Sequence, residues 1–313
     1  MINVIIEVKD LVKRYGDLVA LNHFNLKVEE GQILGLLGPN GSGKSTAINC
    51  MLSLLKYDKG SIQIFGEDMK PTSYKIKQKI GVVFQEVAVL DELSVYDNID
   101  YFCDLYISDK KLRKQYVKEA MEFVGISEYA KFTPKKLSGG LLRRLNIACG
   151  IAHKPTLIFF DEPTVAVDPQ SRNNILAGIK KLNKQGATII YTSHYMEEVE
   201  YLCDDIVIID NGKVIAHGNK DELKSMVSTT EKIRFEIYNL DKSILEGINN
   251  IENVVFVDYQ DTNLTIRFNK ASHNITNIIS YLNDNNVLYE KIISEQPTLN
   301  DVFLEITGKE LRD

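Results

Sequence analysis

One nine-residue segment combines glycines, a lysine and hydroxyl side chains in the order that a phosphate-binding loop requires. The glycines let backbone N–H groups converge on phosphate oxygens, and Lys44 places a positive charge on the β- and γ-phosphates. The hydroxyl of Ser45 is a suitable ligand for Mg²⁺. The segment fits the pattern G-x-x-x-x-G-K-[ST] and comprises Gly38, Pro39, Asn40, Gly41, Ser42, Gly43, Lys44, Ser45 and Thr46.

Two acidic residues, Asp161 and Glu162, directly follow the apolar run 157–160. An acidic pair at a strand end is common, but carboxylates at the C-terminal edge of a parallel sheet can reach a ligand that is bound there. With the phosphate-binding loop upstream, we expect Asp161 to hold the Mg²⁺ shell. We expect Glu162 to be the general base that polarises the attacking water, because phosphoryl transfer needs mainly positioning and charge compensation.

The elements around these residues follow an alternating α/β pattern. The apolar run 32–37 is typical of a buried parallel strand, and apolar residues at helical spacing predict a helix over 44–55, so the loop lies between a strand and a helix. A largely helical stretch is expected over 95–151. Further β-type runs occupy 4–8, 20–28, 80–85, 156–160 and 188–192.

The chain changes character near residues 226–228. Residues 1–228 hold 29 basic and 29 acidic side chains, whereas residues 229–313 hold 8 and 14, so the C-terminal segment carries all of the net charge of −6. Its pattern predicts a small βαββαβ module. We therefore expect two domains, 1–228 and 229–313, of which the second is either a regulatory module or a solubilising acidic surface.

Composition excludes several classes of protein. The excess of acidic over basic residues gives no footprint for nucleic acid, so we expect no nucleic-acid partner. No apolar run reaches the ~18 to 20 residues of a membrane helix, and residues 1–9 lack the features of a signal peptide. Four widely spaced cysteines indicate reduced, mostly buried thiols rather than a zinc site or disulfides.

A further glycine turn, Leu137-Ser138-Gly139-Gly140, precedes a helical pattern over 141–152 and is a second candidate anion site. This turn resembles the signature motif of ABC transporter nucleotide-binding subunits. Together with the loop and the acidic pair, it makes roughly residues 2–225 resemble such a subunit. The resemblance implies a P-loop ABC domain with a parallel core sheet, an antiparallel β subdomain and a helical subdomain. It also implies that Ser138, Gly139 and Gly140 contact the γ-phosphate of ATP bound by the opposite subunit.

Other positions take their expected roles from this resemblance. Gln85 resembles the Q-loop residue that contacts Mg²⁺ and water, and its flanking groove receives a helix of the membrane subunit. His194 resembles the switch histidine at the γ-phosphate, Tyr15 resembles the residue that stacks on adenine, and Asp168 is retained in the D-loop. Two departures are Leu141, where the family most often has Gln, and the D-loop segment 165–167. Neither touches a phosphate-contacting group, so we expect hydrolysis to persist.

The segment 297–312 is similar to the ending of ABC-2-type exporter ATPases, the group of daunorubicin-resistance and sodium-exporter subunits. The resemblance implies ATP and Mg²⁺ as cofactors, a second copy or a homologous ATPase subunit as dimer partner, and integral membrane permeases. It places the protein at the cytoplasmic face of the membrane. Leu299, Val302, Phe303 and Ile306 fall at helical spacing, so this ending is predicted to be a helix docked by its apolar face.

Three alternatives remain beside an exporter ATPase. An importer ATPase is one, although a sugar importer carries a β-barrel C-terminal domain and the βαββαβ pattern disagrees with it. An ABC ATPase that acts on DNA or ribosomes is disfavoured by a single cassette, by the acidic balance and by only about 93 residues between Lys44 and Ser138. A non-transport kinase would lack the signature turn and His194. The sequence does not identify the transported substrate or the pairing of subunits.

Overall fold

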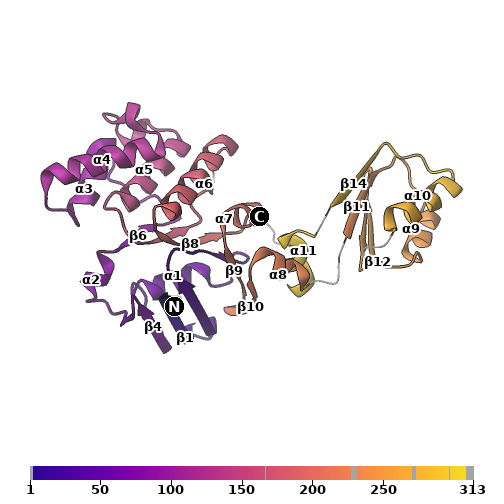
Figure 1. The fold of residues 1–313 in the computed structure, drawn as a ribbon, viewed down its shortest axis with the longest axis horizontal. Coiled ribbons are helices and arrows are strands. Elements are labelled where there is room, and N and C mark those ends of the chain that lie inside the picture. Colours follow the sequence, from indigo (N-terminus) through magenta and orange to yellow (C-terminus); the bar gives the residue numbers. More distant parts are fainter. Residues whose placement is uncertain (1–2, 166, 227–230, 270–272, 296, 308–313) are drawn as a thin grey trace. The chain divides into compact units, whose positions relative to one another are not determined.

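The computed structural model describes residues 3–165, 167–226, 231–269, 273–295 and 297–307 (Figure 1). Contacts divide the chain after Asn219 into two compact units, each considered by itself below. The helix α8 (Lys220–Ser225) thereby groups with the later residues. The predicted boundary at 228 lies outside the described residues, and the domain limits 1–228 and 229–313 stay a prediction.

The central sheet of the first unit has the strand order β10-β9-β3-β8-β7-β6. Its parallel strands are β3 (Ile33–Leu37), β6 (Ile80–Val83), β7 (Leu157–Asp161), β8 (Thr188–Ser193) and β9 (Asp205–Asp210), and β10 (Lys213–Gly218) runs antiparallel to β9. Every residue of β3, β7 and β8 is buried, as expected for strands covered on both faces. The C-terminal ends of β3, β7 and β8 therefore lie together at one edge.

A second, antiparallel sheet of the first unit has the order β2-β1-β4-β5. It consists of β1 (Val4–Tyr15), β2 (Leu18–Glu29), β4 (Lys59–Ile64) and β5 (Glu67–Asp68). Its inner side chains share one hydrophobic core with α1 (Lys44–Met51) and with β3 and β7. This shared core holds the helix that follows the phosphate-binding loop against both sheets.

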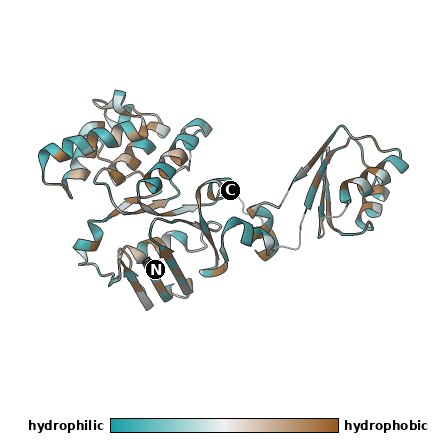
Figure 2. Ribbon diagram, viewed as in Figure 1, coloured by the Kyte–Doolittle hydropathy of each residue, from teal (hydrophilic) through white to brown (hydrophobic). Residues whose placement is uncertain are grey.

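Helices build the remainder of the first unit. They are α2 (Tyr74–Lys77), α3 (Val95–Asp104), α4 (Lys110–Val124), α5 (Gly139–Ile151), α6 (Pro169–Lys184), α7 (Met196–Leu202) and the 3₁₀ turns Ser127–Tyr129 and Pro134–Lys136. A separate apolar cluster joins α3, α4 and α5. Figure 2 shows hydrophilic and hydrophobic residues alternating along these helices, as expected for helices with one buried face. The predicted ABC fold, with its core sheet, antiparallel sheet and helical subdomain, is confirmed.

The second unit contains a four-stranded antiparallel sheet with helices. The order along the chain is β11 (Glu231–Glu236), α9 (Lys242–Asn249), β12 (Val254–Gln260), β13 (Asn263–Phe268), α10 (Asn274–Asp284), β14 (Lys291–Glu295) and α11 (Leu299–Thr307). The spatial order is β12-β13-β11-β14. The predicted βαββαβ module is confirmed.

The last helix, α11, is anchored by both apolar and charged contacts. Leu299, Val302 and Phe303 are buried, whereas Ile306, the fourth residue of the predicted apolar face, is 38% exposed. Asp301 is buried beside Arg267, with 3.2 Å between Oδ1 and Nη2. The predicted docked helix is present, with a shorter apolar face; the segment 308–312 lies outside the described residues.

Several element boundaries differ from the sequence predictions. The helix predicted over 44–55 ends at Met51, because Ser53 has a positive φ of 55° that breaks the helical path. The helix predicted from Leu141 begins at Gly139, because the Ser138 hydroxyl already caps it. The β-type run predicted over 4–8 is part of a longer strand, Val4–Tyr15.

Candidate functional site

The phosphate-binding loop leaves buried strand β3 and enters α1 at Lys44, with Gly43 as the N-cap residue. Gly43 has φ = 110°, and a Cβ there would lie 2.6 Å from the Ala20 carbonyl oxygen. The same carbonyl blocks a Cβ on Gly212, at 2.5 Å, in the turn between β9 and β10. The Gly212 N–H donates to the Ser42 carbonyl at 2.9 Å. The loop is therefore held between β2 and this turn.

No side chain caps α1 in the part of the chain that the structure describes, so the N–H groups of its first turn are available to an anion. The Ser42 hydroxyl is buried and has no hydrogen-bond partner there. Ser45 is exposed and Thr46 is half-buried, both at the start of the helix. This set of donors fits a bound phosphate chain, and the exposed Ser45 hydroxyl fits a metal ligand that faces it.

Lys44 is 4% exposed and is surrounded by acceptors. Its Nζ donates to the carbonyl oxygens of Gly38 at 2.8 Å and Pro39 at 3.1 Å, and it lies 3.4 Å from Oε1 of Glu162. Burial lowers the pKa of the Lys44 ammonium, while the Glu162 carboxylate acts in the opposite direction. A cation in this position is neutralised by protein groups that a triphosphate can replace.

Glu162 lies between Lys44 and His194. Its other carboxylate oxygen, Oε2, is 3.4 Å from Nδ1 of His194, and this ring nitrogen is buried without a hydrogen bond in the described structure. Glu162 itself is 6% exposed and has a positive φ of 48°, which a non-glycine residue rarely adopts. The strained turn aims its carboxylate at the phosphate-binding loop, a pattern common at functional sites.

Asp161 is positioned by the adjacent strand. The Thr192 hydroxyl on β8 donates to Oδ1 of Asp161 at 2.7 Å and accepts from the Glu162 N–H at 2.9 Å. One hydroxyl therefore fixes both acidic residues, and Thr192 is a site residue that the sequence predictions missed. The available signal was the position of Thr192, a polar residue at the end of an apolar β-type run, as Asp161 is at the end of another.

A buried carboxylate, Glu198 on α7, connects the segments on either side of the site. Its Oε2 accepts hydrogen bonds from the hydroxyls of Thr164 (2.9 Å), Tyr191 (2.7 Å) and Ser193 (2.9 Å). Its Oε1 lies 3.3 Å from Nε of Arg172 on α6. The turn after Glu162 and the residue before His194 are thus tied to one anchor, which sequence reasoning also missed.

The signature turn opens helix α5 at the surface. The Ser138 hydroxyl accepts from the Leu141 N–H at 3.4 Å, and Ser138 and Gly139 are exposed. A Cβ on Gly139 would have no heavy atom within 4 Å, whereas one on Gly140 would lie 3.3 Å from Oδ2 of Asp168. The start of α5 therefore presents an open N-terminus.

The remaining predicted site residues lie apart from the Lys44–Glu162–His194 cluster in the contacts of the described chain. Tyr15 is 49% exposed, with Nζ of Lys13 5.0 Å from its ring centroid. Gln85 is exposed in the loop after β6. Asp168 caps α6 by accepting from the Ser171 N–H at 2.9 Å, and these Ser171 hydrogen bonds lower the pKa of Asp168. Of the departing D-loop segment, Val167 is buried and Ala166 lies outside the described residues.

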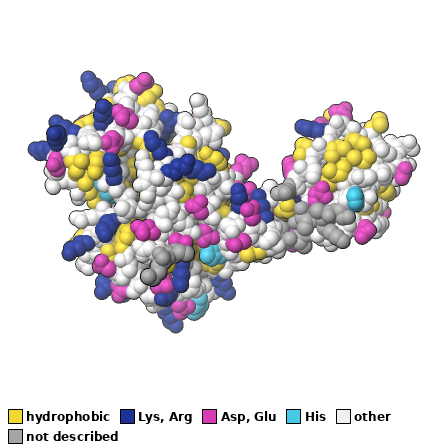
Figure 3. Space-filling view, viewed as in Figure 1, with side chains coloured by type: hydrophobic (Ala, Val, Ile, Leu, Met, Phe, Trp, Pro, Cys, Tyr) yellow, Lys and Arg dark blue, Asp and Glu magenta, His cyan; other side chains and the backbone are white. Residues whose placement is uncertain are grey.

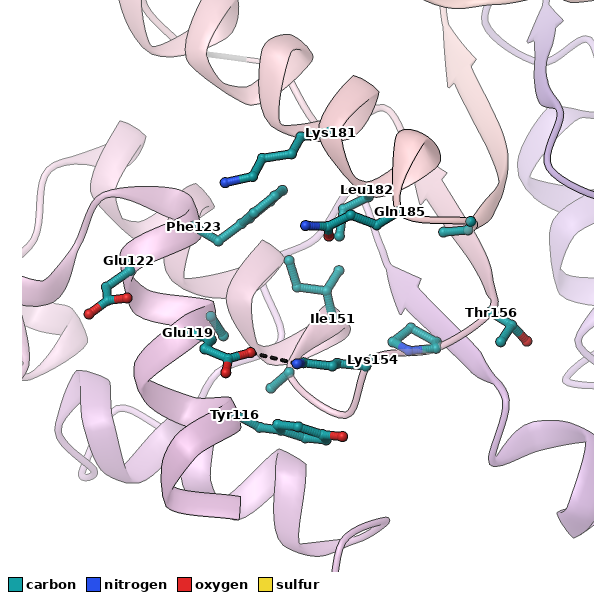
Figure 4. A pocket seen from close by; sticks show the side chains of 15 residues that line it. Tyr116, Glu119, Glu122, Phe123, Ile151, Lys154, Thr156, Lys181, Leu182 and Gln185 are labelled. Atoms are coloured by element: carbon teal, nitrogen blue, oxygen red, sulfur yellow. Dashed lines mark ion pairs between the residues drawn. The ribbon is translucent and has the colours of Figure 1, made fainter. Parts of the chain in front are cut away.

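A cavity that is separate from these residues lies elsewhere in the first unit. It measures about 560 Å³ between α4 and the C-terminal ends of α5 and α6, and Figure 4 shows its lining. Lys154 there forms an ion pair with Glu119 at 2.5 Å and lies over the Tyr116 ring. None of its lining residues belongs to the predicted site.

The comparisons with known proteins agree with this geometry. The family model described as ABC transporter matches residues 21–165. The linearmycin resistance ATP-binding protein LnrL of Bacillus subtilis is 37% identical, over 98% of this chain and all of that protein. The chain belongs to the ATP-binding subunits of ABC transporters. It is thus an ATPase of the ABC type, as the signature turn predicted.

A further sequence relative and a solved structure are also similar to this chain. The daunorubicin resistance ATP-binding protein DrrA3 of Streptomyces coeruleorubidus is 31% identical, over 100% of this chain and 98% of that protein. A dimeric ATP-binding cassette, solved in a post-hydrolysis state with ADP and phosphate, has a TM-score of 0.63 and 26% identity. That match covers 68% of this chain and 98% of the cassette. The expected resemblance to drug-exporter ATPases is confirmed.

Proposed function

We propose that this protein hydrolyses ATP to drive export through separate membrane subunits, with a drug, an antibiotic or a lipid as cargo. The observation that carries the proposal is the convergence of Lys44, Glu162 and His194 in a chain that matches resistance ATPases over its full length. No helix in the described ranges is long and apolar enough to span a bilayer, so the membrane passage is assigned to partner subunits. The ATPase would then act at the cytoplasmic face.

Each group at the site has a distinct task in hydrolysis. The loop N–H groups and Lys44 hold the triphosphate, and Lys44 exchanges its Gly38 and Pro39 carbonyl contacts for phosphate oxygens. Glu162 orients and deprotonates the attacking water, and His194, beside it, donates to the γ-phosphate. Glu198 keeps the Glu162 turn and the His194 loop in register.

Asp161, Ser45 and Gln85 supply the oxygen donors that Mg²⁺ prefers, and the exposed hydroxyl and the strand-end carboxylate fit such an ion. Bound Mg²⁺ would neutralise charge on the β- and γ-phosphates. The Thr192 hydroxyl occupies one lone pair of Asp161 and leaves its second oxygen for this role. The metal assignment therefore rests on a hydroxyl, a carboxylate and an amide.

The open signature turn supports a dimer in which two copies share each ATP. Ser138 and Gly139 are exposed, and the turn begins a 13-residue helix whose positive end favours an anion. We assign the γ-phosphate bound by a second copy, or by a homologous subunit, as its ligand. Tyr15, exposed at the end of β1, is available to stack on adenine, and Asp168 lies beside the turn.

A groove of about 320 Å³ beside the Gln85 loop supports docking of a membrane subunit. Its lining includes Phe84, Ala88 and Asn146, together with Leu54 and Leu105, which are 61% and 60% exposed. Large apolar side chains at this exposure are suited to a partner surface. An apolar helix of a permease is the proposed occupant.

The test uses the full-length protein with its permease subunits in membrane vesicles. We expect ATP-dependent uptake of a cationic dye or a fluorescent lipid into inside-out vesicles, abolished by Lys44→Ala and by Glu162→Gln. Hydrolysis without transport of any such probe would count against export. Loss of permease association after Leu54→Asp, with ATP binding retained, would identify the groove.

The alternatives receive less support. The longest helix between Lys44 and Ser138 is α4, with 15 residues among those described, and chromosome-maintenance ATPases need long coiled coils there. On the face seen in Figure 3, Lys and Arg over the first unit are interspersed with Asp and Glu. An importer with a β-barrel C-terminal domain disagrees with the helices α9 and α10 of the second unit.

A further inference from the structure

Helix α5 buries a cation that the hydrolysis scheme above does not use. Arg143 is 7% exposed, and its Nη1 donates to the carbonyl oxygens of Phe84 at 3.1 Å and Gln85 at 2.7 Å. Among the described residues, no carboxylate lies within ion-pair distance of it, and burial lowers its pKa. Both acceptors are backbone groups at the point where β6 ends and the Gln85 loop begins.

A second residue of α5 reinforces the same contact. Asn146, three positions after Arg143 and therefore on the same face of the helix, donates to the Phe84 carbonyl at 3.3 Å. Its side-chain oxygen accepts from the Ala88 N–H at 3.1 Å. The loop backbone is thus tied to α5 on both sides of Gln85, while the Gln85 side chain stays exposed.

A purely structural role does not account for a buried arginine here. A buried cation without a carboxylate partner costs more than an apolar side chain of similar volume would. The charge does supply two strong donors from a single planar nitrogen, aimed at adjacent carbonyls. The arrangement therefore trades stability for a fixed orientation of two peptide groups, those on either side of Gln85.

We propose that Arg143 is a positioning residue for Gln85: it locks the Gln85 backbone to the helix that begins with the signature turn Ser138–Gly140. The inference rests on the role of Gln85 in the proposed function. Movement of α5, when the signature turn engages ATP across the dimer, then moves Gln85 toward the nucleotide of its own subunit. Occupancy of the groove acts on the same contact, because Phe84, Ala88 and Asn146 line it.

A double-mutant cycle on the full-length protein tests this proposal. The variants are Arg143→Met, which keeps an unbranched apolar side chain and removes both donors, Gln85→Ala, and the combination of the two. Arg113→Gln is the matched control, because Arg113 is a half-buried arginine of the helical subdomain, with its side chain 13% exposed, but pairs with Asp100 and Asp104. For each we would measure kcat and KM for MgATP, the melting temperature, and amide exchange over residues 84–90.

We expect Arg143→Met to lower kcat about tenfold with KM changed less than about threefold, and to have less than about a twofold effect once Gln85 is alanine. Arg143→Lys should recover part of kcat, since it keeps a cationic donor. Exchange over 84–90 should accelerate in Arg143→Met and stay unchanged in Arg113→Gln. If Arg143→Met does not fold, the same cycle is run with Arg143→Lys, and its smaller loss of kcat should likewise disappear once Gln85 is alanine.

The outcomes distinguish a failure of the role assigned to Gln85 from a failure of the positioning role of Arg143. A wild-type kcat in Gln85→Ala would overturn the assigned role of Gln85 and with it the proposed function of that loop. If Gln85→Ala lowers kcat but the Arg143 effect is undiminished in its background, or Arg113→Gln has the same effect, the positioning role alone fails. Unchanged exchange over 84–90 in Arg143→Met would likewise overturn it.

Discussion

Replacing Glu162 by glutamine removes one negative charge from a site where Lys44 Nζ and Glu162 Oε1 lie 3.4 Å apart and are 4% and 7% exposed. At an effective dielectric constant of 20, two unit charges at this distance attract by about 5 kcal/mol. Lys44 keeps its two carbonyl acceptors, so we expect the free energy of unfolding of the nucleotide-free protein to fall by about 3 kcal/mol.

Turnover should respond far more strongly than stability. A general base contributes about 10²- to 10⁴-fold to the rate, which is about 3 to 5 kcal/mol of activation free energy. Binding of MgATP should be retained or strengthened, because the amide no longer repels the γ-phosphate and no longer competes for Lys44. The stabilisation by MgATP should therefore exceed that of the wild type.

The assays are phosphate release under saturating MgATP and thermal denaturation with and without MgATP. Glu119→Gln is the matched control: it also neutralises a carboxylate paired with a lysine, but in the cavity of Figure 4, and its kcat should equal that of the wild type. Wild-type hydrolysis by Glu162→Gln would refute the general-base assignment. A smaller MgATP shift than in the wild type would refute the competition between carboxylate and phosphate.

Three further expectations concern other parts of the molecule. Ser138→Arg should lower kcat by about 100-fold and leave MgATP binding by the monomer unchanged, as measured by titration; an unaffected rate would contradict the shared site. The pKa of His153 is lowered to about 4, mainly by burial, so protonation of this side chain favours the unfolded chain. The stabilisation that comes from neutral His153 is fully present above pH 6.5 and is lost as the pH falls toward 4. Denaturant titrations should show the free energy of unfolding falling by about 3 kcal/mol over this pH range, and by much less in His153→Gln. Equal pH dependence in both proteins would exclude His153 as its cause. Thiol titration of the native protein should detect no rapid reaction, and four thiols after unfolding, because all four cysteines are buried: Cys50, Cys103, Cys149 and Cys203.

The parts of the site that are contiguous in sequence were predictable. The loop around Lys44 and the pair Asp161–Glu162 can be recognised in the sequence, because spacing and residue type alone define their chemistry. The buried strands that precede them fix their position in the fold. The contact between Arg143 and the Gln85 carbonyl joins residues 58 positions apart, and a backbone acceptor has no sequence signature. The hydroxyl contacts of Glu198 could not be predicted either, because Ser, Thr and Tyr are common residues and these contacts follow no sequence pattern.

Helix limits failed for a related reason. The apolar spacing of Leu52 and Leu55 continues the pattern of α1, yet the helix ends at Met51, where the chain turns at Ser53. Periodicity reports which side chains are buried and not which backbone conformation buries them. The folded neighbours, in this case the shared core of two sheets, decide the boundary.

The Ala20 carbonyl that faces both Gly43 and Gly212 has a consequence for how nucleotide is captured. A cradle wedged on its outer side by main-chain atoms is already formed before any ligand arrives, so little ordering entropy is lost when phosphate enters. Among variants that leave the phosphate-contacting residues and Glu162 unchanged, differences in ATP affinity should then arise at the adenine and across the dimer. Even a methyl group at either glycine would push the cradle inward, toward the space reserved for the phosphates.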